Sequence, residues 1–323
     1  MKTEKLRKIW KAEEALAHIH GWDFSHIDSR YREEGSLPWD YRKIILSHLG
    51  DRDYLLDMDT GGGEFLLSLG HPYSRTSATE AYPPNAELCR RLLAPLGIDF
   101  REAPGNQTLP FADSCFDMVI NRHGNYDAGE VNRILKPGGI FITQQVGEDN
   151  DRELVELLLP GTPKPFPGMN LKEQSKKLKE SGFDILEQGE AFRPIRFFDV
   201  GALVWFAKII EWEFPGFCVD GCLDRLAAAQ GLLESGGSIE GTIHRYMMTA
   251  PAFSSTSGSC SFSHIRDGKA NPVNALFLNI SPISLKSSTL LMDSSSFLER
   301  WSSHRIAGLR GFPSQSATTI PCI

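Results

Sequence analysis

The sequence predicts an α/β fold, in which helices cover a mainly parallel sheet. The main observation is a short apolar run, Tyr54 to Met58, which contains a single acid and is followed by three glycines after Asp59 and Thr60. A helical pattern of apolar residues begins directly after the glycines, at Glu64. This order is typical of a buried strand, a tight turn and a helix. Short apolar runs and amphipathic segments continue to alternate as far as residue 249, which extends the same architecture.

The glycine turn, Gly61 to Gly63, is a candidate ligand site. Glycine has no Cβ, so a ligand can approach its backbone closely, and the free N–H groups of the following helix point toward the turn. The turn lacks the Lys-Ser/Thr ending of a phosphate-binding P-loop and the regular G-x-G-x-x-G spacing of the dinucleotide fold. A purely structural turn fits the pattern equally well.

The segments before this strand are predicted to be helical. Lys5 to His20 interleaves charges with apolar residues, as an amphipathic helix does, and a second helix from Tyr41 to Leu49 leads into the strand. Trp39 and Tyr41 lie where the second helix begins. They are either gate residues of a substrate pocket or core anchors of that helix.

Polar side chains follow the later strands. Glu80 ends the second strand about 20 residues after the glycines, where a carboxylate can accept hydrogen bonds from the hydroxyls of a ribose. Asn106 and Gln107 follow the third strand, and Asn121 ends the fourth. Ligands of open α/β sheets bind at these carboxyl ends. His123, just beyond the fourth strand, is therefore either a group that contacts a ligand or acts as a base, or a loop histidine bonded to backbone.

Three segments resemble motifs of the class I S-adenosylmethionine (SAM)-dependent methyltransferases, type 11 family. Residues 57–63 resemble Asp/Glu-x-Gly-x-Gly-x-Gly, and residues 105–117 resemble the Gly-Asp-Ala-x-Leu-Pro-Phe block with its Phe-Asp ending. Residues 130–139 resemble the Glu-x-x-Arg-Val-Leu-Lys-Pro-Gly-Gly turn. The chain departs from the pattern twice, because Asp59 replaces the first glycine and Asn106 replaces the adenine-binding aspartate.

The resemblance implies SAM as the cofactor and in-line methyl transfer to a small molecule. Most of the rate would come from holding the nucleophile and the methyl in line, so that His123 is only a tentative catalytic residue. The implied cofactor-binding residues are Asp57, Asp59, Thr60, Gly61, Gly63, Glu80, Asn106, Gln107 and Asn121. The candidate substrate-binding residues are Trp39, Tyr41, Gln145 and Trp205.

The resemblance also implies a Rossmann-like, seven-stranded, mostly parallel sheet whose last strand is antiparallel. The expected parts are an N-terminal helical arm (1–50), the methyltransferase domain (51–250) with a helical cap at about 197–235, and a serine-rich, poorly ordered tail (251–323). The aromatic density of residues 197–214 fits either a cap over an apolar substrate or a helix buried on all sides.

Composition narrows the class of partner. The net charge of −7 disfavours nucleic acid and anionic membranes, and no apolar run has the length of a membrane span. The six cysteines are scattered, as in a reducing cytoplasm, and they suggest neither a disulfide framework nor a metal site. The alternatives are an RNA methyltransferase, whose ribosomal-RNA class carries an N-terminal zinc ribbon that this sequence lacks, and a SAM-binding module without turnover.

Overall fold

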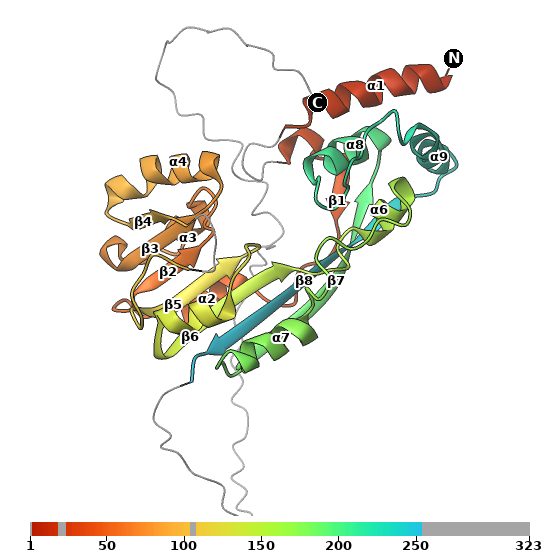
Figure 1. The fold of residues 1–323 in the computed structure, drawn as a ribbon. Coiled ribbons are helices and arrows are strands. Elements are labelled where there is room, and N and C mark those ends of the chain that lie inside the picture. The colour runs from red at the N-terminus through yellow and green to blue at the C-terminus, as the bar shows by residue number, and fades with distance from the viewer. Residues whose placement is uncertain (1, 19–23, 104–107, 254–323) are drawn as a thin grey trace, which may run out of the picture. The chain divides into compact units, whose positions relative to one another are not determined.

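The computed structural model describes residues 2–18, 24–103 and 108–253, and within them the strands form one mixed sheet (Figure 1). The strand order across the sheet is β1-β7-β8-β6-β5-β2-β3-β4. The strands are β1 (Tyr31–Glu33), β2 (Leu55–Met58), β3 (Thr76–Glu80), β4 (Asp99–Glu102), β5 (Phe116–Arg122), β6 (Leu135–Val146), β7 (Glu187–Phe197) and β8 (Ile239–Pro251).

Five neighbouring strands of the sheet, β4, β3, β2, β5 and β6, run parallel to one another. In contrast, β8 runs antiparallel to both of its neighbours, β6 and β7. The expected fold class, with seven strands and an antiparallel last strand, is therefore confirmed. The described residues add β1, a three-residue edge strand antiparallel to β7, which sequence patterning does not reveal because its Tyr-Arg-Glu sequence carries no apolar alternation. The serine-rich tail lies outside the described residues.

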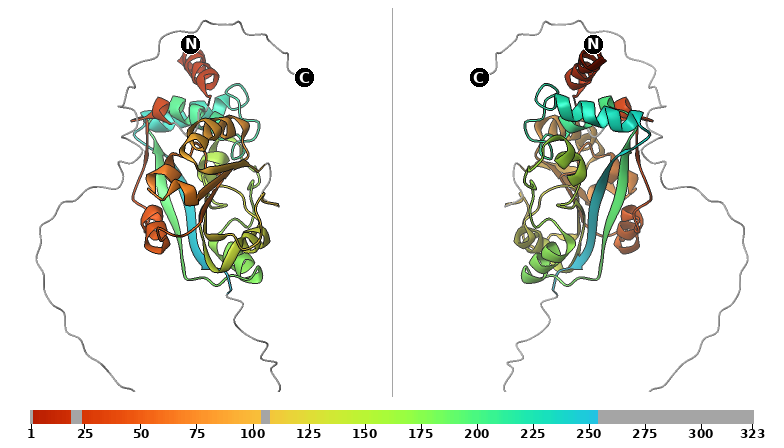
Figure 2. Two further views of the ribbon diagram at one scale, coloured as in Figure 1. Left: turned by 90° about the vertical axis from the view of Figure 1, so that its left-hand side faces the viewer. Right: turned by 90° about the vertical axis from the view of Figure 1, so that its right-hand side faces the viewer.

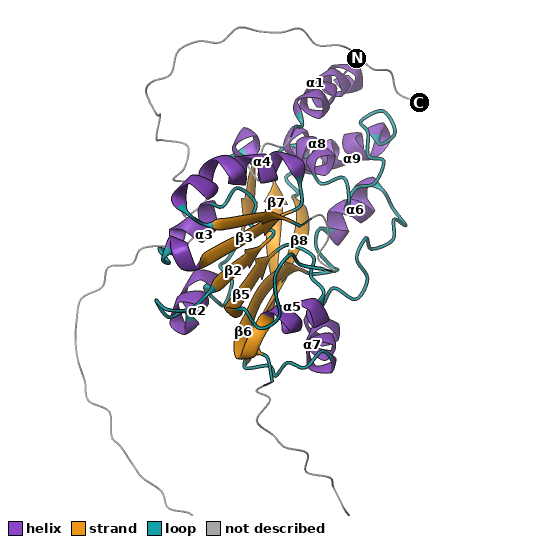
Figure 3. Cartoon of the chain, turned by 60° about the vertical axis from the view of Figure 1, so that its left-hand side comes forward, coloured by secondary structure: helices purple, strands orange, loops and turns teal. Residues whose placement is uncertain are grey.

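Helices cover both faces of the parallel part of the sheet (Figure 3). The helices are α1 (Lys2–Leu16), α2 (Tyr41–His48), α3 (Glu64–Ser68), α4 (Pro83–Leu92), α5 (Ala128–Ile134), α6 (Arg152–Leu158), α7 (Leu171–Glu180), α8 (Val200–Ile209) and α9 (Leu223–Glu234). Four of them begin at an Asp or Asn whose side chain accepts a backbone N–H in the first turn, which stabilises the helix start. None of the helices in the described ranges is long and apolar enough to cross a bilayer.

Successive residues of a strand point to opposite faces, and this alternation divides the core. Leu55 of β2 packs with residues of α2, α3 and α4, whereas Leu56 and Met58 pack with residues of α5 and α7. The parallel part of the sheet is thus the middle of three layers, which leaves the carboxyl ends of its strands for a binding site.

The β7–β8 hairpin extends well beyond the neighbouring strand β6. Pairing of β6 with β8 ends at Val146 and Arg245, but pairing of β7 with β8 continues to Phe197 and Ile239. Most of β7 is half-exposed, and buried residues appear only near its end, at Ile195 and Phe197. The extension pairs with β1 and packs with helices α1, α6, α8 and α9, seen together in Figure 2.

These helices and the extended hairpin share one hydrophobic core, here called the hairpin core. It combines Trp10 and Ile27 from the N-terminal region with residues of α6, β7, α8, α9 and β8. Trp205 of α8 is only 2% exposed, and its ring lies 5.7 Å from that of Phe24. The aromatic stripe of residues 197–214 therefore contributes largely to packing, and Trp205 lies inside the core.

Replacing Trp205 with alanine should lower the free energy of unfolding by about 3–5 kcal/mol, because the change leaves a large cavity in the hairpin core. Denaturant unfolding measures this loss. The matched control is Phe198→Ala, since that side chain is exposed and its removal should cost about 1 kcal/mol or less. An unchanged stability for Trp205→Ala would show that the indole lines an open pocket instead.

Candidate functional site

The turn after β2 adopts backbone conformations that favour glycine. Asp59, Gly61 and Gly63 have φ values of 53°, 65° and 86°. A Cβ added at Gly63 would lie 2.8 Å from the Leu93 side chain, so no larger residue fits there, whereas one added at Gly61 meets nothing within 4 Å. The turn is therefore closely packed against α4 at Gly63 and open at Gly61.

Asp57 is a buried acid at the end of β2. It is 4% exposed, and its Oδ2 accepts a 2.6 Å hydrogen bond from the Thr60 hydroxyl. Burial raises the pKa of Asp57 to about 7, against the opposing effects of the Thr60 hydrogen bond and the Arg122 charge. A cationic group placed beside this carboxyl would favour its ionised form.

Glu80, at the end of β3, holds the glycine turn against the neighbouring strand. Its Oε2 accepts the backbone N–H of Gly61, and its Oε1 accepts those of Ala81 and Tyr82, each at 2.8 Å. A carboxylate has about four acceptor positions, so Oε2 can accept one more hydrogen bond. The sequence suggested that Glu80 accepts from two ribose hydroxyls, and these contacts leave room for one.

Asn121 connects three strands from within the sheet. Its Nδ2 donates to the Met58 carbonyl at 3.1 Å, and its Oδ1 accepts from Gln145 Nε2 at 2.5 Å. Gln145 also donates to the Thr143 hydroxyl and is 2% exposed, so the candidate substrate residue Gln145 lies in a buried network. A Cβ on Gly124 would lie 2.4 Å from Asp59 Oδ2, which shows how closely that carboxylate approaches the loop after β5.

The structure thus brings together most of the expected cofactor-binding residues at the carboxyl ends of β2, β3 and β5. They are Asp57, Asp59, Thr60, Gly61, Gly63, Glu80 and Asn121. Asn106 and Gln107 lie outside the described residues.

Trp39, Gln144 and His123 form a second group at the same strand ends. The indole N–H of Trp39 donates to Gln144 Oε1 at 2.8 Å, and Gln144 Nε2 lies 3.3 Å from His123 Nε2. Solvent reaches His123, but the surrounding protein desolvates its ring and lowers its pKa well below 6.5, with smaller contributions from the charges of Arg245 and Arg122. The tentative base His123 is therefore a neutral imidazole.

Tyr41 lies beneath this edge as a packing residue. Its hydroxyl donates to the carbonyls of Asn121 at 3.1 Å and Ile142 at 3.2 Å, and its ring stacks on that of Phe65. Burial raises the pKa of the Tyr41 hydroxyl far above its ordinary value. Neither Tyr41 nor Trp205 is open to solvent, whereas Trp39 is partly exposed.

Sequence patterning does not identify a polar cluster near the end of β6. Asp151 is 2% exposed and Glu213 is 3% exposed, and Asp151 Oδ1 and Glu213 Oε2 have no hydrogen-bond partner among the described residues. Burial raises the pKa of Asp151 to about 8 and that of Glu213 to about 7, although the positive charge of Arg245 opposes both shifts. In the sequence, Asp151 is marked only by its position in a polar run after a strand, which is a weak signal of a functional residue. No sequence pattern marks Glu213.

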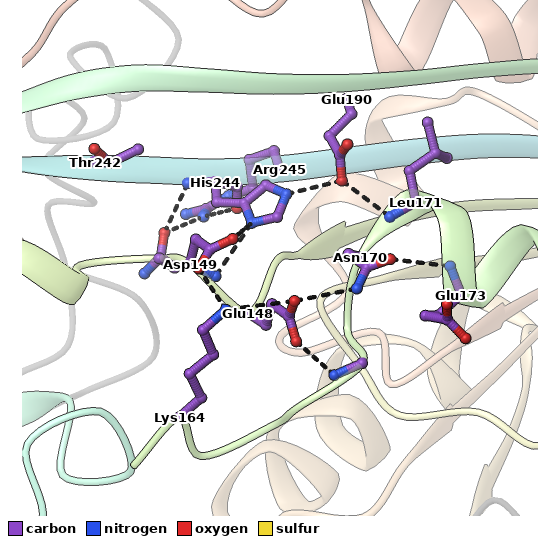
Figure 4. Close-up of polar contacts among 12 residues, drawn as sticks. Glu148, Asp149, Lys164, Asn170, Leu171, Glu173, Glu190, Thr242, His244 and Arg245 are labelled. Atoms are coloured by element: carbon purple, nitrogen blue, oxygen red, sulfur yellow. Dashed lines mark hydrogen bonds and ion pairs between the residues drawn. The ribbon is translucent and has the colours of Figure 1, made fainter. Parts of the chain in front are cut away.

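Arg245 links this cluster to a hydrogen-bond network that orders the loop after β6 (Figure 4). Its guanidinium donates to Asn150 Oδ1 at 2.7 Å. The adjacent His244, 1% exposed, accepts the backbone N–H of Asp149 at Nδ1 and lies 3.0 Å from Glu190 Oε1 at Nε2. The loop is thereby held on β7 and β8, close to the strand ends.

Taken together, the strand order, the glycine turn and the acid at the end of β3 are those of a Rossmann-like fold of the class I methyltransferase type. A family model described as a methyltransferase domain matches residues 56–143. That segment contains β2 to β5, most of β6 and the glycine turn. This match supports, over that segment, the resemblance to class I SAM-dependent methyltransferases that the sequence motifs predicted.

Two curated relatives each match about a third of the chain. A phthiotriol/phenolphthiotriol dimycocerosates methyltransferase of Mycobacterium tuberculosis is 31% identical over 110 residues, which are 32% of this chain and 40% of the relative. Sterol 4-C-methyltransferase strm-1 of Caenorhabditis elegans is 30% identical over 113 residues, 32% of this chain and 34% of the relative. The chain thus spans less than half the length of either relative.

Among solved structures, a putative methyltransferase from Bacillus halodurans C-125 aligns with a TM-score of 0.48 at 15% identity. The alignment covers 67% of this chain and 99% of that one.

The buried acids make stability depend on pH. In the folded chain, Asp151 and Glu213 have pKa values of about 8 and about 7, above their ordinary values of 3.8 and 4.5. Protonation of these two groups therefore stabilises the fold fully below pH 4, and this contribution to stability is lost as the pH rises through about 7 and 8. The free energy of unfolding should therefore fall between pH 5 and pH 8, by up to about 1.4 kcal/mol per pH unit for each group, and denaturant unfolding at each pH measures this fall.

The Asp151→Asn variant should show a smaller decrease in the free energy of unfolding with pH. It should therefore become more stable than the wild type as the pH rises. Exposed Asp184 supplies the control, because Asp184→Asn should leave the slope unchanged. Parallel pH profiles for Asp151→Asn and the wild type would contradict the placement of Asp151.

Proposed function

We propose that this protein is a methyltransferase that transfers the methyl group of SAM to a small-molecule acceptor. The observation that carries the proposal is the contact between the glycine turn and the acid of the next strand, Gly61 N–H to Glu80 Oε2 at 2.8 Å. It brings a backbone open to a ligand beside a carboxylate with acceptor capacity, at the strand ends where open α/β sheets bind nucleotides.

The residues at this edge fit the chemical groups of SAM. The buried carboxyl of Asp57 suits the ammonium of the amino-acid part, which would stabilise its ionised form. The free position on Glu80 Oε2 suits one ribose hydroxyl, and the open side of Gly61 admits the cofactor without contact with a Cβ. Asp59 adds a carboxylate that favours a cationic ligand over a phosphate.

SAM supplies an electrophilic methyl group on a sulfonium. The chain's own part is to hold the acceptor in line with that methyl, which by itself accounts for a large part of the barrier lowering in oriented reactions. The lowered pKa makes His123 a weaker base, which agrees with a mechanism in which an already nucleophilic acceptor needs no proton removal.

The named relatives act on a complex lipid and on a sterol, which supports a small-molecule acceptor with an apolar part. The net charge of −7 supports the same choice over RNA. A binding module without turnover would share the cofactor site and differ only in producing no S-adenosylhomocysteine.

Glu80→Gln should weaken SAM binding about 10- to 100-fold, because a hydrogen bond to a charged acceptor contributes about 1.5–3 kcal/mol. Isothermal titration calorimetry with SAM and S-adenosylhomocysteine measures this change. The matched control is Glu102→Gln at the end of β4, where the exposed carboxylate contacts Arg90. Equal affinities for Glu80→Gln and the wild type would refute the site, and a wild type that binds SAM without releasing S-adenosylhomocysteine in cell extract would be a binding module.

A further inference from the structure

The contacts of Trp39, Gln144 and His123 fix where the histidine carries its proton. An indole N–H can only donate, so the Gln144 atom 2.8 Å from Trp39 Nε1 must be the amide oxygen. The other end of the same amide is then its NH₂ group, which also only donates. Since this group lies 3.3 Å from His123 Nε2, that ring nitrogen must accept. The remaining proton of a neutral imidazole is consequently on Nδ1.

We propose that Gln144, oriented by Trp39, holds His123 as the neutral Nδ1–H tautomer, so that His123 presents a hydrogen-bond donor to the methyl acceptor and does not serve as its base. Gln144 and Trp39 are then positioning residues. The tautomer follows from the contacts alone, whereas the role toward the acceptor rests on the proposed function.

Two further observations support this assignment. The backbone of His123 is fixed, since its N–H donates to the Gln144 carbonyl at 2.9 Å and its φ is 63°, so the ring is anchored to β6 through main chain and side chain. The positive groups that face the ring, Arg122 from β5 and Arg245 from β8, oppose a second proton. The His123 residue is exposed, so its ring is accessible to a ligand.

The chemistry of the acceptor follows from this donor. An imidazole N–H in the positive field of Arg122 and Arg245 favours a carbonyl or carboxylate oxygen, and disfavours an ammonium. The acceptor is thus expected to carry such an oxygen near the atom that is methylated.

Alternation along β6 explains why Gln144 and Gln145 differ. Successive strand residues point to opposite faces, so Gln145 joins the buried network of Asn121 while Gln144 turns toward Trp39 and His123. Trp39 is held in place by packing, because a Cβ on Gly189 would lie 3.0 Å from its ring. A fixed indole therefore sets the orientation of the amide.

The test is the protonation state of the His123 ring nitrogens, read from two-bond ¹H–¹⁵N correlation spectra of the labelled full chain at pH 7 without SAM or acceptor. The signals among the nine histidines are assigned by their loss in His123→Asn. We expect Nδ1 protonated and Nε2 unprotonated in the wild type. A wild-type ring protonated at Nε2, alone or at both nitrogens, overturns the proposal.

The Gln144→Glu variant tests whether Gln144 determines the tautomer of His123. A carboxylate only accepts, so this variant should move the proton to Nε2 or add a second one, and Trp39→Phe should populate both tautomers because the amide is free to turn. Gln188→Glu, an exposed change on β7, controls for the added charge and should leave the spectrum unchanged. A Gln144→Glu spectrum identical to that of the wild type overturns the role of Gln144.

Measurement of turnover distinguishes a hydrogen-bond donor role of His123 from a role as a base. The amide of His123→Asn places a donor near the position of Nδ1, and that of His123→Gln reaches only the position of Nε2. If His123 donates, the asparagine variant should release S-adenosylhomocysteine faster than the glutamine variant, and comparable losses in both overturn the donor role. Absence of turnover in the wild type would refute the proposed function and leave the tautomer assignment decided by the spectra.

Discussion

The geometry of the site depends on the carboxylate of Glu80. A buried charge is tolerated only when hydrogen bonds replace water, and here three backbone N–H groups do so. One of them belongs to the glycine turn, which also contains Asp59 in a left-handed conformation that costs on the order of 1 kcal/mol or more for a residue with a side chain. Charge-assisted bonds of about 1.5–3 kcal/mol each are large enough to offset that strain. The same group that could contact a ribose thus keeps the turn in its binding-competent shape.

The second constraint is the length of the β7–β8 hairpin. Because its two strands pair beyond the end of β6, they provide a surface on which the N-terminal helix and the helical insert pack together. Residues as far apart in sequence as Trp10 and Ile243 consequently share one core. Most aromatic side chains of residues 197–214 are buried in this packing, namely Phe197, Trp205, Phe206 and Phe214. The more exposed Trp39 is therefore a better candidate for substrate contact than Trp205.

Sequence reasoning succeeds where a local pattern determines the structure. The buried strand before Gly61 and the amide at the end of β5 are each marked by a short apolar run, whereas Glu80 is marked by its position about 20 residues after the glycines. Parallel strands bring such ends together. It fails where the partner is distant in sequence. Pairing of β1 with β7 and the burial of Asp151 and Glu213 depend on segments far apart in the chain. Strand alternation shows that Gln144 and Gln145 point to opposite faces of the sheet. It identifies which of the two faces the site only once the open face of the sheet is known.

The protonation of the site then forms a consistent picture. Burial favours the neutral forms of Asp57 and Asp151, so the strand ends carry less charge near pH 7 than their formal composition suggests. In such surroundings a cationic ligand gains more from each nearby carboxyl than it would in water, because the interaction is less screened. Ionisation of Asp57 and the binding of an ammonium are accordingly linked, since each favours the other. Because Gln144 holds the His123 proton at Nδ1 in our proposal, His123 takes no part in this linkage. Its role is then to orient the acceptor.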